Sequence, residues 1–126
     1  MRAVDTNVLV RLIARDDQKQ VQLAEEFVSK GAWISHLVLA ETAWVLDSFF
    51  KLDAAQIADA IAMLLNHAQF TIEDADVVAS ALEIFRKRPD VSFVDNLIVE
   101  IARKSGHLPL GTFDRAMSKL ERAERL

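Results

Sequence analysis

Short β-like runs alternate with longer segments of helical period, and this alternation limits the fold more than any other feature of the sequence. Four runs have the length and composition of strands: residues 2–4, 32–34, 69–72 and 108–111. Between the runs, apolar residues recur at the i, i+3, i+4, i+7 spacing of an amphipathic helix. Such alternation favours an α/β fold with a parallel sheet.

Four apolar stripes mark the predicted helices. They are Val78, Ala81, Leu82 and Phe85; Ile57, Ile61, Leu64 and Leu65; Val94, Ile98, Ile101 and Ala102; and Phe113, Met117 and Leu120. We interpret all four as faces that pack on the core. Asp53 with Gln56 has the spacing of a capping box, and Ser92 with Asp95 resembles it.

The composition is that of one globular domain spanning residues 1–126. A chain of this size, with 52% hydrophobic residues, buries roughly two thirds of its surface on folding. The sequence contains no cysteine, which excludes disulfides, a thiol nucleophile and cysteine-ligated zinc. No apolar run reaches the length of a membrane span, so we expect a soluble, cytoplasmic protein. The net charge of −4 gives no general attraction to nucleic acid, although bound cations reverse the local field.

Four acidic residues are placed to meet at one edge of the predicted sheet. Asp5 and Asp114 each follow a predicted strand, and parallel strands with right-handed crossovers deliver their following loops to the same edge. Asp95 reaches that edge if its helix runs antiparallel to the strands. Glu41 lies about one and a half turns into the helix after the second strand, within reach of the same edge.

The run HLVLAETAWVL puts Glu41 among apolar residues. Leu37 lies four residues before it and Trp44 three after, so they share one helix face. Asp95 similarly stacks over apolar neighbours. A carboxylate withdrawn from water costs several kcal/mol unless it is paired, protonated or metal-bound. A divalent cation would remove the repulsion among such acids, and oxygen-only ligands favour Mg²⁺ or Mn²⁺.

Each acid also has a purely structural alternative. Asp5 and Asp114 have the positions of helix caps, and Asp95 has the third position of a capping box. Glu41 lies in mid-helix, where no cap is needed, and its alternative is partial exposure to solvent. The metal hypothesis therefore depends on all four acids together.

Four motifs in order resemble the PIN-domain family, most closely its toxin members of the VapC type. They are AVDTNVLVRLI, LVLAETAWVL, SFVDNLIVEIA and PLGTFDRAM, and they span nearly the whole chain. The resemblance implies metal ligation by Asp5, Glu41, Asp95 and Asp114, with Asp5 and Asp95 as the first candidates for direct ligands. It also implies that Thr6, Asn7 and Thr112 orient the ligands or the scissile phosphate.

The fold implied by the resemblance is a three-layer α/β/α sandwich. Its parallel sheet has four to five strands in the order 3-2-1-4-5, and a fifth strand would have to lie within residues 123–126. The implied activity is Mg²⁺- or Mn²⁺-dependent endoribonucleolytic hydrolysis of RNA. The implied setting is the toxin of a type II toxin/antitoxin pair, a homodimer that a small antitoxin neutralises.

Three other interpretations are open. A haloacid-dehalogenase-like phosphotransferase also begins with an aspartate after the first strand, but Asn7 stands where its second aspartate is needed. A receiver domain needs an acidic pair directly after that strand, and Asp16-Asp17 comes too late. A non-catalytic PIN-like scaffold would only bind a partner, and the presence of all four acids argues against it.

The remaining polar and aromatic residues have ordinary interpretations. The basic residues form three groups: Arg86, Lys87 and Arg88; Arg103, Lys104 and His107; and Arg115, Lys119, Arg122 and Arg125. Interspersed acids favour an ion-paired, solvated face over RNA contact. We expect His36, His67 and His107 at the surface or at helix ends, and Trp33 and Trp44 in the core or an interface.

Overall fold

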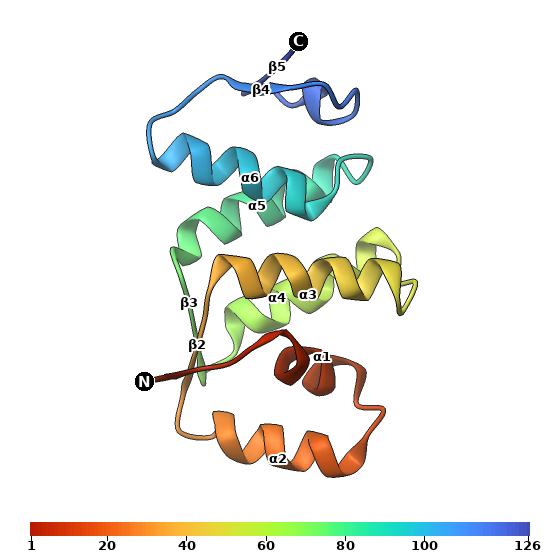
Figure 1. Cartoon of the computed structure of the whole chain (residues 1–126), viewed down its shortest axis with the longest axis vertical. Coiled ribbons are helices and arrows are strands. Elements are labelled where there is room, and N and C mark those ends of the chain that lie inside the picture. The colour runs from red at the N-terminus through yellow and green to blue at the C-terminus, as the bar shows by residue number, and fades with distance from the viewer. The chain divides into compact units, whose positions relative to one another are not determined.

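The computed structural model describes all 126 residues, as six α-helices, one 3₁₀ helix and five strands (Figure 1). The chain divides into two compact units, Met1–Ala75 and Asp76–Leu126. The elements up to the third strand are β1 (Arg2–Ala3), α1 (Thr6–Ala14), α2 (Gln18–Val28), β2 (Ala32–Ile34), α3 (His36–Ser48), α4 (Ala54–Asn66) and β3 (Phe70–Ile72). The later elements are α5 (Ala75–Lys87), α6 (Phe93–Lys104), β4 (Leu110–Thr112), the 3₁₀ helix η1 (Met117–Lys119) and β5 (Ala123–Arg125).

The first unit contains a three-stranded parallel sheet in the order β1-β2-β3. Arg2 pairs with Ala32, and Ala32 in turn pairs with Phe70. Helix α1 packs against both α2 and α3, and α4 packs against α3 and β3. The ends of β1 and β2 therefore lead directly into α1 and α3. Asp5 immediately precedes α1, and Glu41 lies in the second turn of α3.

Large aliphatic side chains fill the core of the first unit. Its fully buried members include Leu9, Ile34, Leu39, Leu46 and Ile61. The predicted stripe of α4 is confirmed, since three of its four residues are buried and the fourth is partly buried. The predicted capping box is also formed: the side chains of Asp53 and Gln56 each accept the backbone N–H of the other.

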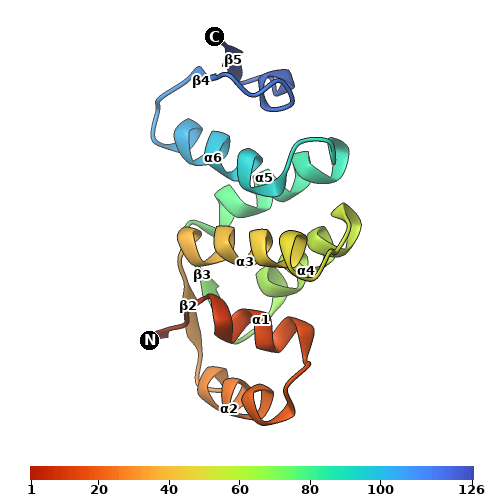
Figure 2. The same cartoon turned by 45° about the vertical axis from the view of Figure 1, so that its right-hand side comes forward.

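The second unit is built on an antiparallel pair of helices, α5 and α6, which lie side by side in Figures 1 and 2. Asp76 at the start of α5 binds Lys104 at the end of α6, with Nζ and Oδ1 3.0 Å apart. At the opposite end, the rings of Phe85 and Phe93 meet edge to face with centroids 6.1 Å apart. The predicted stripe of α5 is fully buried, as expected.

Two short parallel strands, β4 and β5, complete the second unit. Leu110 pairs with Ala123 and Thr112 with Arg125. Beneath them, Val91, Val99, Met117 and Leu120 form a buried apolar cluster. These contacts attach the C-terminal segment to α6.

The predicted α/β class with parallel strands is confirmed, and the four predicted strands form within two residues of their expected positions. The fifth strand also forms. Within each unit the neighbouring strands agree with the order 3-2-1-4-5. The adjacency of β1 and β4, the three-layer arrangement and the single domain stay predictions.

Two predicted helical faces are wrong. The stripe of Phe113, Met117 and Leu120 does not start an α-helix, because the segment makes one 3₁₀ turn and then pairs with β4. In α6 the buried face holds Phe93, Asn96, Leu97, Val99 and Glu100, while Ile98 of the predicted stripe is 43% exposed. The periodicity of apolar residues fails here because two polar side chains of α6 are buried with partners of their own. None of the six α-helices has the length and apolar character needed to cross a bilayer.

Candidate functional site

Asp5 occupies the turn between β1 and α1. Its backbone is extended, and its Oδ1 accepts the backbone N–H of Val8 at 3.2 Å, so it caps α1. The carboxylate is exposed, and its Oδ2 accepts no hydrogen bond from the protein. Asp5 therefore does cap a helix, as the structural alternative to metal binding required, but the cap uses only one of its two carboxylate oxygens.

Glu41 lies on α3 and is connected to the turn that carries Asp5. The hydroxyl of Thr6, the residue after Asp5, donates to Glu41 Oε2 at 3.2 Å. The expectation that Glu41 is withdrawn from water is wrong, because it is exposed, as are Leu37 and Trp44 on the same face. The buried face of α3 is instead formed by Leu39, Thr42, Ala43 and Leu46.

Asp95 lies in the first turn of α6 and is half-buried. Ser92 caps this helix, its Oγ accepting the backbone N–H of Asp95 at 3.0 Å. Burial raises the pKa of Asp95, and the negative charge of Asp114 raises it further, while a hydrogen bond with Ser92 opposes both. Asp95 and Asp114 are thus close enough to repel each other.

Asp114 follows β4 and is exposed. Its Oδ1 accepts the backbone N–H of Met117 at 2.9 Å, and its own N–H donates to Thr112 Oγ1 at 3.0 Å. As in Asp5, only one of the two carboxylate oxygens accepts a hydrogen bond. Thr112 holds the turn that presents the carboxylate, and its supporting role at a metal site stays a prediction.

The structure therefore arranges the four predicted acids as two pairs, one in each unit. Asp5 and Glu41 share Thr6 as a neighbour, and Asp95 and Asp114 interact through their charges. Within its own unit, no carboxylate of the four pairs with a lysine or arginine. Neither unit alone contains three or more histidine, aspartate or glutamate side chains grouped to hold a metal ion.

The third predicted supporting residue, Asn7, has a different setting. Its side chain is exposed and lines a groove of about 350 Å³ between α1 and α2, together with residues such as Arg11 and Phe27. Thr6 and Thr112 contact the predicted acids or their turn, whereas no hydrogen bond joins Asn7 to either acid of its unit.

The basic residues of the second unit are mostly ion-paired, as predicted. The pairs are Lys87 with Glu83, Arg88 with Asp90, Arg103 and Arg122 with Glu100, and Lys104 with Asp76. Arg115, Lys119 and Arg125 form no ion pair within this unit and are exposed. These three are the cations left for other contacts.

The structure reveals one charged residue that the sequence analysis missed. Glu100 of α6 is fully buried, with 0% of its surface exposed, and it accepts hydrogen bonds from Ser80, Arg103 and Arg122. Burial raises the pKa of Glu100, but these three hydrogen bonds outweigh it and hold the pKa below the ordinary value. The sequence offered one local signal, since Arg103 lies three residues further along the helix.

The histidines lie at helix ends or the surface, as predicted. His36 starts α3, with its Nδ1 3.9 Å from Glu73 Oε1, His67 follows the end of α4, and His107 is exposed. The tryptophans are not core residues, because Trp33 is 37% and Trp44 65% exposed. The interface alternative for them stays a prediction.

The comparisons by sequence agree with the resemblance to the PIN-domain family. A family model described as PIN domain matches residues 2–123. A VapC ribonuclease from Aquifex aeolicus (strain VF5) is 26% identical over 125 residues, covering 95% of this chain and 92% of that protein. The crystal structure of Mycobacterium tuberculosis VapC20, a sarcin-ricin loop cleaving toxin, is 22% identical, covers 98% of both chains and has a TM-score of 0.44. Because the family model extends across both compact units, the chain belongs to the PIN-domain family.

Proposed function

We propose that this protein is an endoribonuclease that hydrolyses RNA phosphodiester bonds with the help of Mg²⁺ or Mn²⁺. Membership of the PIN-domain family and the near full-length alignment with a VapC ribonuclease support the activity. The same family membership argues against the phosphotransferase alternative. That alternative needs a second aspartate at position 7, where this chain has Asn7. The four acids Asp5, Glu41, Asp95 and Asp114 form the proposed metal site.

The observation that carries the proposal is the interaction of Asp95 with Asp114. Burial and the charge of Asp114 both raise the pKa of Asp95, so the ionised form of Asp95 is destabilised in the folded protein. No lysine or arginine of the unit pairs with either acid. A hard divalent cation is the partner that fits such an oxygen-only pair.

The first unit would supply the other two ligands. Asp5 has a free Oδ2, and Thr6 fixes Glu41 through Oε2, which leaves Oε1 open. In the second unit, Thr112 holds the turn of Asp114. The residues of the chain thus hold and orient the carboxylates, while a bound ion supplies a water of lowered pKa and neutralises charge on the phosphoryl oxygens.

Neutralising one acid in each unit tests the proposal. Asp5→Asn and Asp95→Asn keep the size of the side chain, and asparagine still caps a helix. We expect both variants to remain folded and to lose Mn²⁺-dependent cleavage of a mixed RNA substrate. Asp47→Asn and Glu124→Gln, exposed acids of the first and second unit, are matched controls that should retain cleavage. Full activity of Asp5→Asn and Asp95→Asn would refute the mechanism.

The non-catalytic scaffold is the competing function. The observation in its favour is that Asp5 caps α1 and that Asp114 accepts the backbone N–H of Met117, so both acids already have structural hydrogen bonds. A scaffold predicts no cleavage by the wild-type chain at any Mn²⁺ concentration. It also predicts that Asp5→Asn and Asp114→Asn leave partner binding unchanged. Cleavage by the wild type together with its loss in Asp95→Asn would exclude the scaffold.

We further propose that the protein is the toxin of a type II pair, acting as a homodimer and neutralised by a small antitoxin. Leu37, Trp44 and Phe49 expose 69%, 65% and 75% of their surfaces on or next to α3, and exposed apolar side chains of this size favour a protein contact. Sedimentation tests the dimer, since a mass independent of concentration and equal to one chain would contradict it. The antitoxin is tested by asking whether the gene lies beside a short reading frame and whether the product of that frame, when co-expressed, binds this chain and stops cleavage.

A further inference from the structure

Glu100 is the only glutamate or aspartate that the fold removes completely from water. Charged side chains are almost never fully buried unless they are paired, and burying one that is badly paired costs several kcal/mol. Glu100 lies on α6, five positions after Asp95, and faces away from solvent into the second unit. A buried carboxylate so close to a proposed ligand calls for a specific role.

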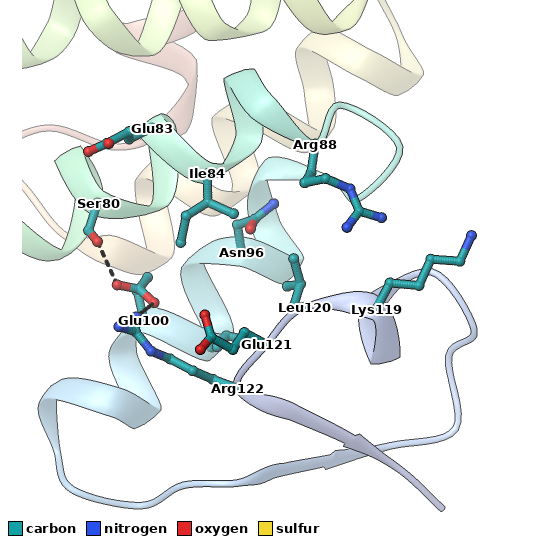
Figure 3. Close-up of a pocket in the computed structure, with 11 residues that line it drawn as sticks. Ser80, Glu83, Ile84, Arg88, Asn96, Glu100, Lys119, Leu120, Glu121 and Arg122 are labelled. Atoms are coloured by element: carbon teal, nitrogen blue, oxygen red, sulfur yellow. Dashed lines mark hydrogen bonds and ion pairs between the residues drawn. The ribbon is translucent and has the colours of Figure 1, made fainter.

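Its three hydrogen-bond donors come from three different parts of the unit. Ser80 of α5 donates its hydroxyl to Oε1 at 2.7 Å, and Arg103 of α6 donates Nε to the same oxygen at 2.9 Å. Arg122, just before β5, donates Nη1 to Oε2 at 2.8 Å. Figure 3 shows the carboxylate between the Ser80 hydroxyl and the Arg122 guanidinium. One side chain therefore joins α5, α6 and the C-terminal segment.

A cavity of about 480 Å³ lies beside Glu100, but binding of a ligand there does not explain why this glutamate is buried. Its lining includes three cations, Arg88, Lys119 and Arg122, but also the acids Glu83, Glu100 and Glu121 (Figure 3). Arg88 is already paired with Asp90, and Arg122 with Glu100. With its charges balanced and largely paired, the cavity offers no net charge to a ligand.

A chain of hydrogen bonds connects Glu100 to the turn of Asp114, through Arg122 and strand β4. The carbonyl of Arg122 accepts the N–H of Leu110 at 3.0 Å, so Arg122 holds the start of β4. Strand β4 ends at Thr112, whose hydroxyl accepts the N–H of Asp114. Glu100 itself is rigidly connected to Asp95 through the helix that both residues share.

We propose that Glu100 and Arg122 are positioning residues that set the separation of Asp95 and Asp114. The apolar cluster of Val99, Met117 and Leu120 holds the C-terminal segment against α6, but apolar contact is non-directional. A charge-assisted hydrogen bond has a defined geometry, so the Glu100–Arg122 pair fixes where along α6 the segment sits. The inference rests on the proposed function only in taking these two aspartates as metal ligands.

The test is a double-mutant cycle on Mn²⁺ affinity, measured by titration calorimetry without RNA. Arg122→Met removes the ion pair but keeps the length of the stem, and Arg125→Met removes one exposed, unpaired cation from the same segment as the matched control. We expect Arg122→Met to weaken Mn²⁺ binding about tenfold and Arg125→Met to weaken it less than twofold. Arg122→Lys, which keeps the charge, should recover part of the loss.

The cycle separates positioning from general destabilisation. In an Asp114→Asn background, Arg122→Met should have almost no further effect, since the ligand that it positions is already lost. In an Asp5→Asn background it should still cost about tenfold. Equal effects of Arg122→Met in both backgrounds, or unchanged affinity with Asp114 intact, would overturn the positioning role.

A second measurement keeps the inference apart from the proposed function. Hydrogen exchange of the Leu110 and Asp114 amides reports whether β4 is held, with no metal present. We expect faster exchange at both amides in Arg122→Met and not in Arg125→Met. A wild-type chain that binds no Mn²⁺ would refute the proposed metal site, whereas unchanged exchange in Arg122→Met would refute the positioning by Glu100 and Arg122.

Discussion

The hydroxyl of Thr6 donates to the carboxylate of Glu41 across 35 positions of sequence, with 3.2 Å between the two oxygens. This bond connects the turn after β1 to the second turn of α3. It orients Glu41 relative to Asp5, although α3 leaves the other side chains of that face in solvent.

Removing this hydroxyl should affect activity more than stability. Thr6→Val keeps the shape of the side chain but loses the hydrogen bond, and because Glu41 is exposed we expect a loss of less than about 1 kcal/mol in the free energy of unfolding. Cleavage should fall by about tenfold, as for other residues that orient metal ligands. Thr6→Ser restores the hydroxyl and should restore the rate. Equal losses of cleavage rate in Thr6→Val and Thr6→Ser would show that the hydrogen bond from the Thr6 hydroxyl does not support activity.

Asp95→Asn should make the fold more stable while it abolishes cleavage. Burial and Asp114 raise the pKa of Asp95 above its ordinary value of 3.8, so the folded state binds the proton more tightly than the unfolded state. Ionisation of Asp95 therefore lowers stability as the pH rises above 3.8. Without metal, we expect a higher Tm for Asp95→Asn at pH 7 and equal Tm values near pH 3. A lower Tm at pH 7 would contradict the assigned repulsion, and Asp47→Asn serves as the neutral control.

Glu100→Gln should show the opposite dependence on pH. The hydrogen bonds of Ser80, Arg103 and Arg122 hold the pKa of Glu100 below its ordinary value of 4.5. This carboxylate therefore contributes stability above pH 4.5, and that contribution is lost as the pH falls through its folded-state pKa.

Urea unfolding at pH 7 and at pH 3 measures this contribution. At pH 7 we expect Glu100→Gln to cost about 3 kcal/mol, the lower end for a broken buried pair, because both arginines are partly exposed. At pH 3 the difference should shrink. A cost that is the same at both pH values would show that Glu100 acts through its shape and not through its charge.

The unpaired cations of the second unit should account for part of the salt dependence of RNA binding. Arg115 and Lys119 are exposed and form no ion pair there. Each phosphate contact on a single strand contributes about 0.7 to the slope of log affinity against log salt. In the Asp95→Asn background, which prevents cleavage, the double change Arg115→Ala with Lys119→Ala should reduce this slope by about 1.4. Lys87→Ala, which removes a cation already paired with Glu83, should leave the slope unchanged.

Local sequence was sufficient for most of the secondary structure, since short apolar runs between polar clusters became strands and apolar stripes became α4 and α5. It was insufficient where partners come from elsewhere in the chain. The sequence of β5, Ala123-Glu124-Arg125, has no strand character of its own and becomes a strand because β4 pairs with it. The same pairing prevents the predicted final helix from continuing beyond η1.

The candidate site shows the same division between local and distant information. The motifs named the four candidate acids, whose role as metal ligands stays a prediction. Helical spacing misjudged the environment of Glu41, because spacing alone cannot tell which face of α3 packs on the core. Glu100 escaped notice because Arg122, its partner, lies 22 positions away. Hydrophobic periodicity counts a charged residue as exposed, and only the folded backbone shows that two arginines and a serine surround it.

Asp5 and Asp114 each bind a helix start through Oδ1, and this has a consequence for the thermodynamics of ligand capture. These hydrogen bonds restrict rotation about the side-chain bonds as soon as α1 and η1 form, so part of the rotational entropy is lost before any cation binds. If the two residues bind a cation as proposed, the second oxygen of each is already oriented, and binding at these two positions needs less further ordering of the protein.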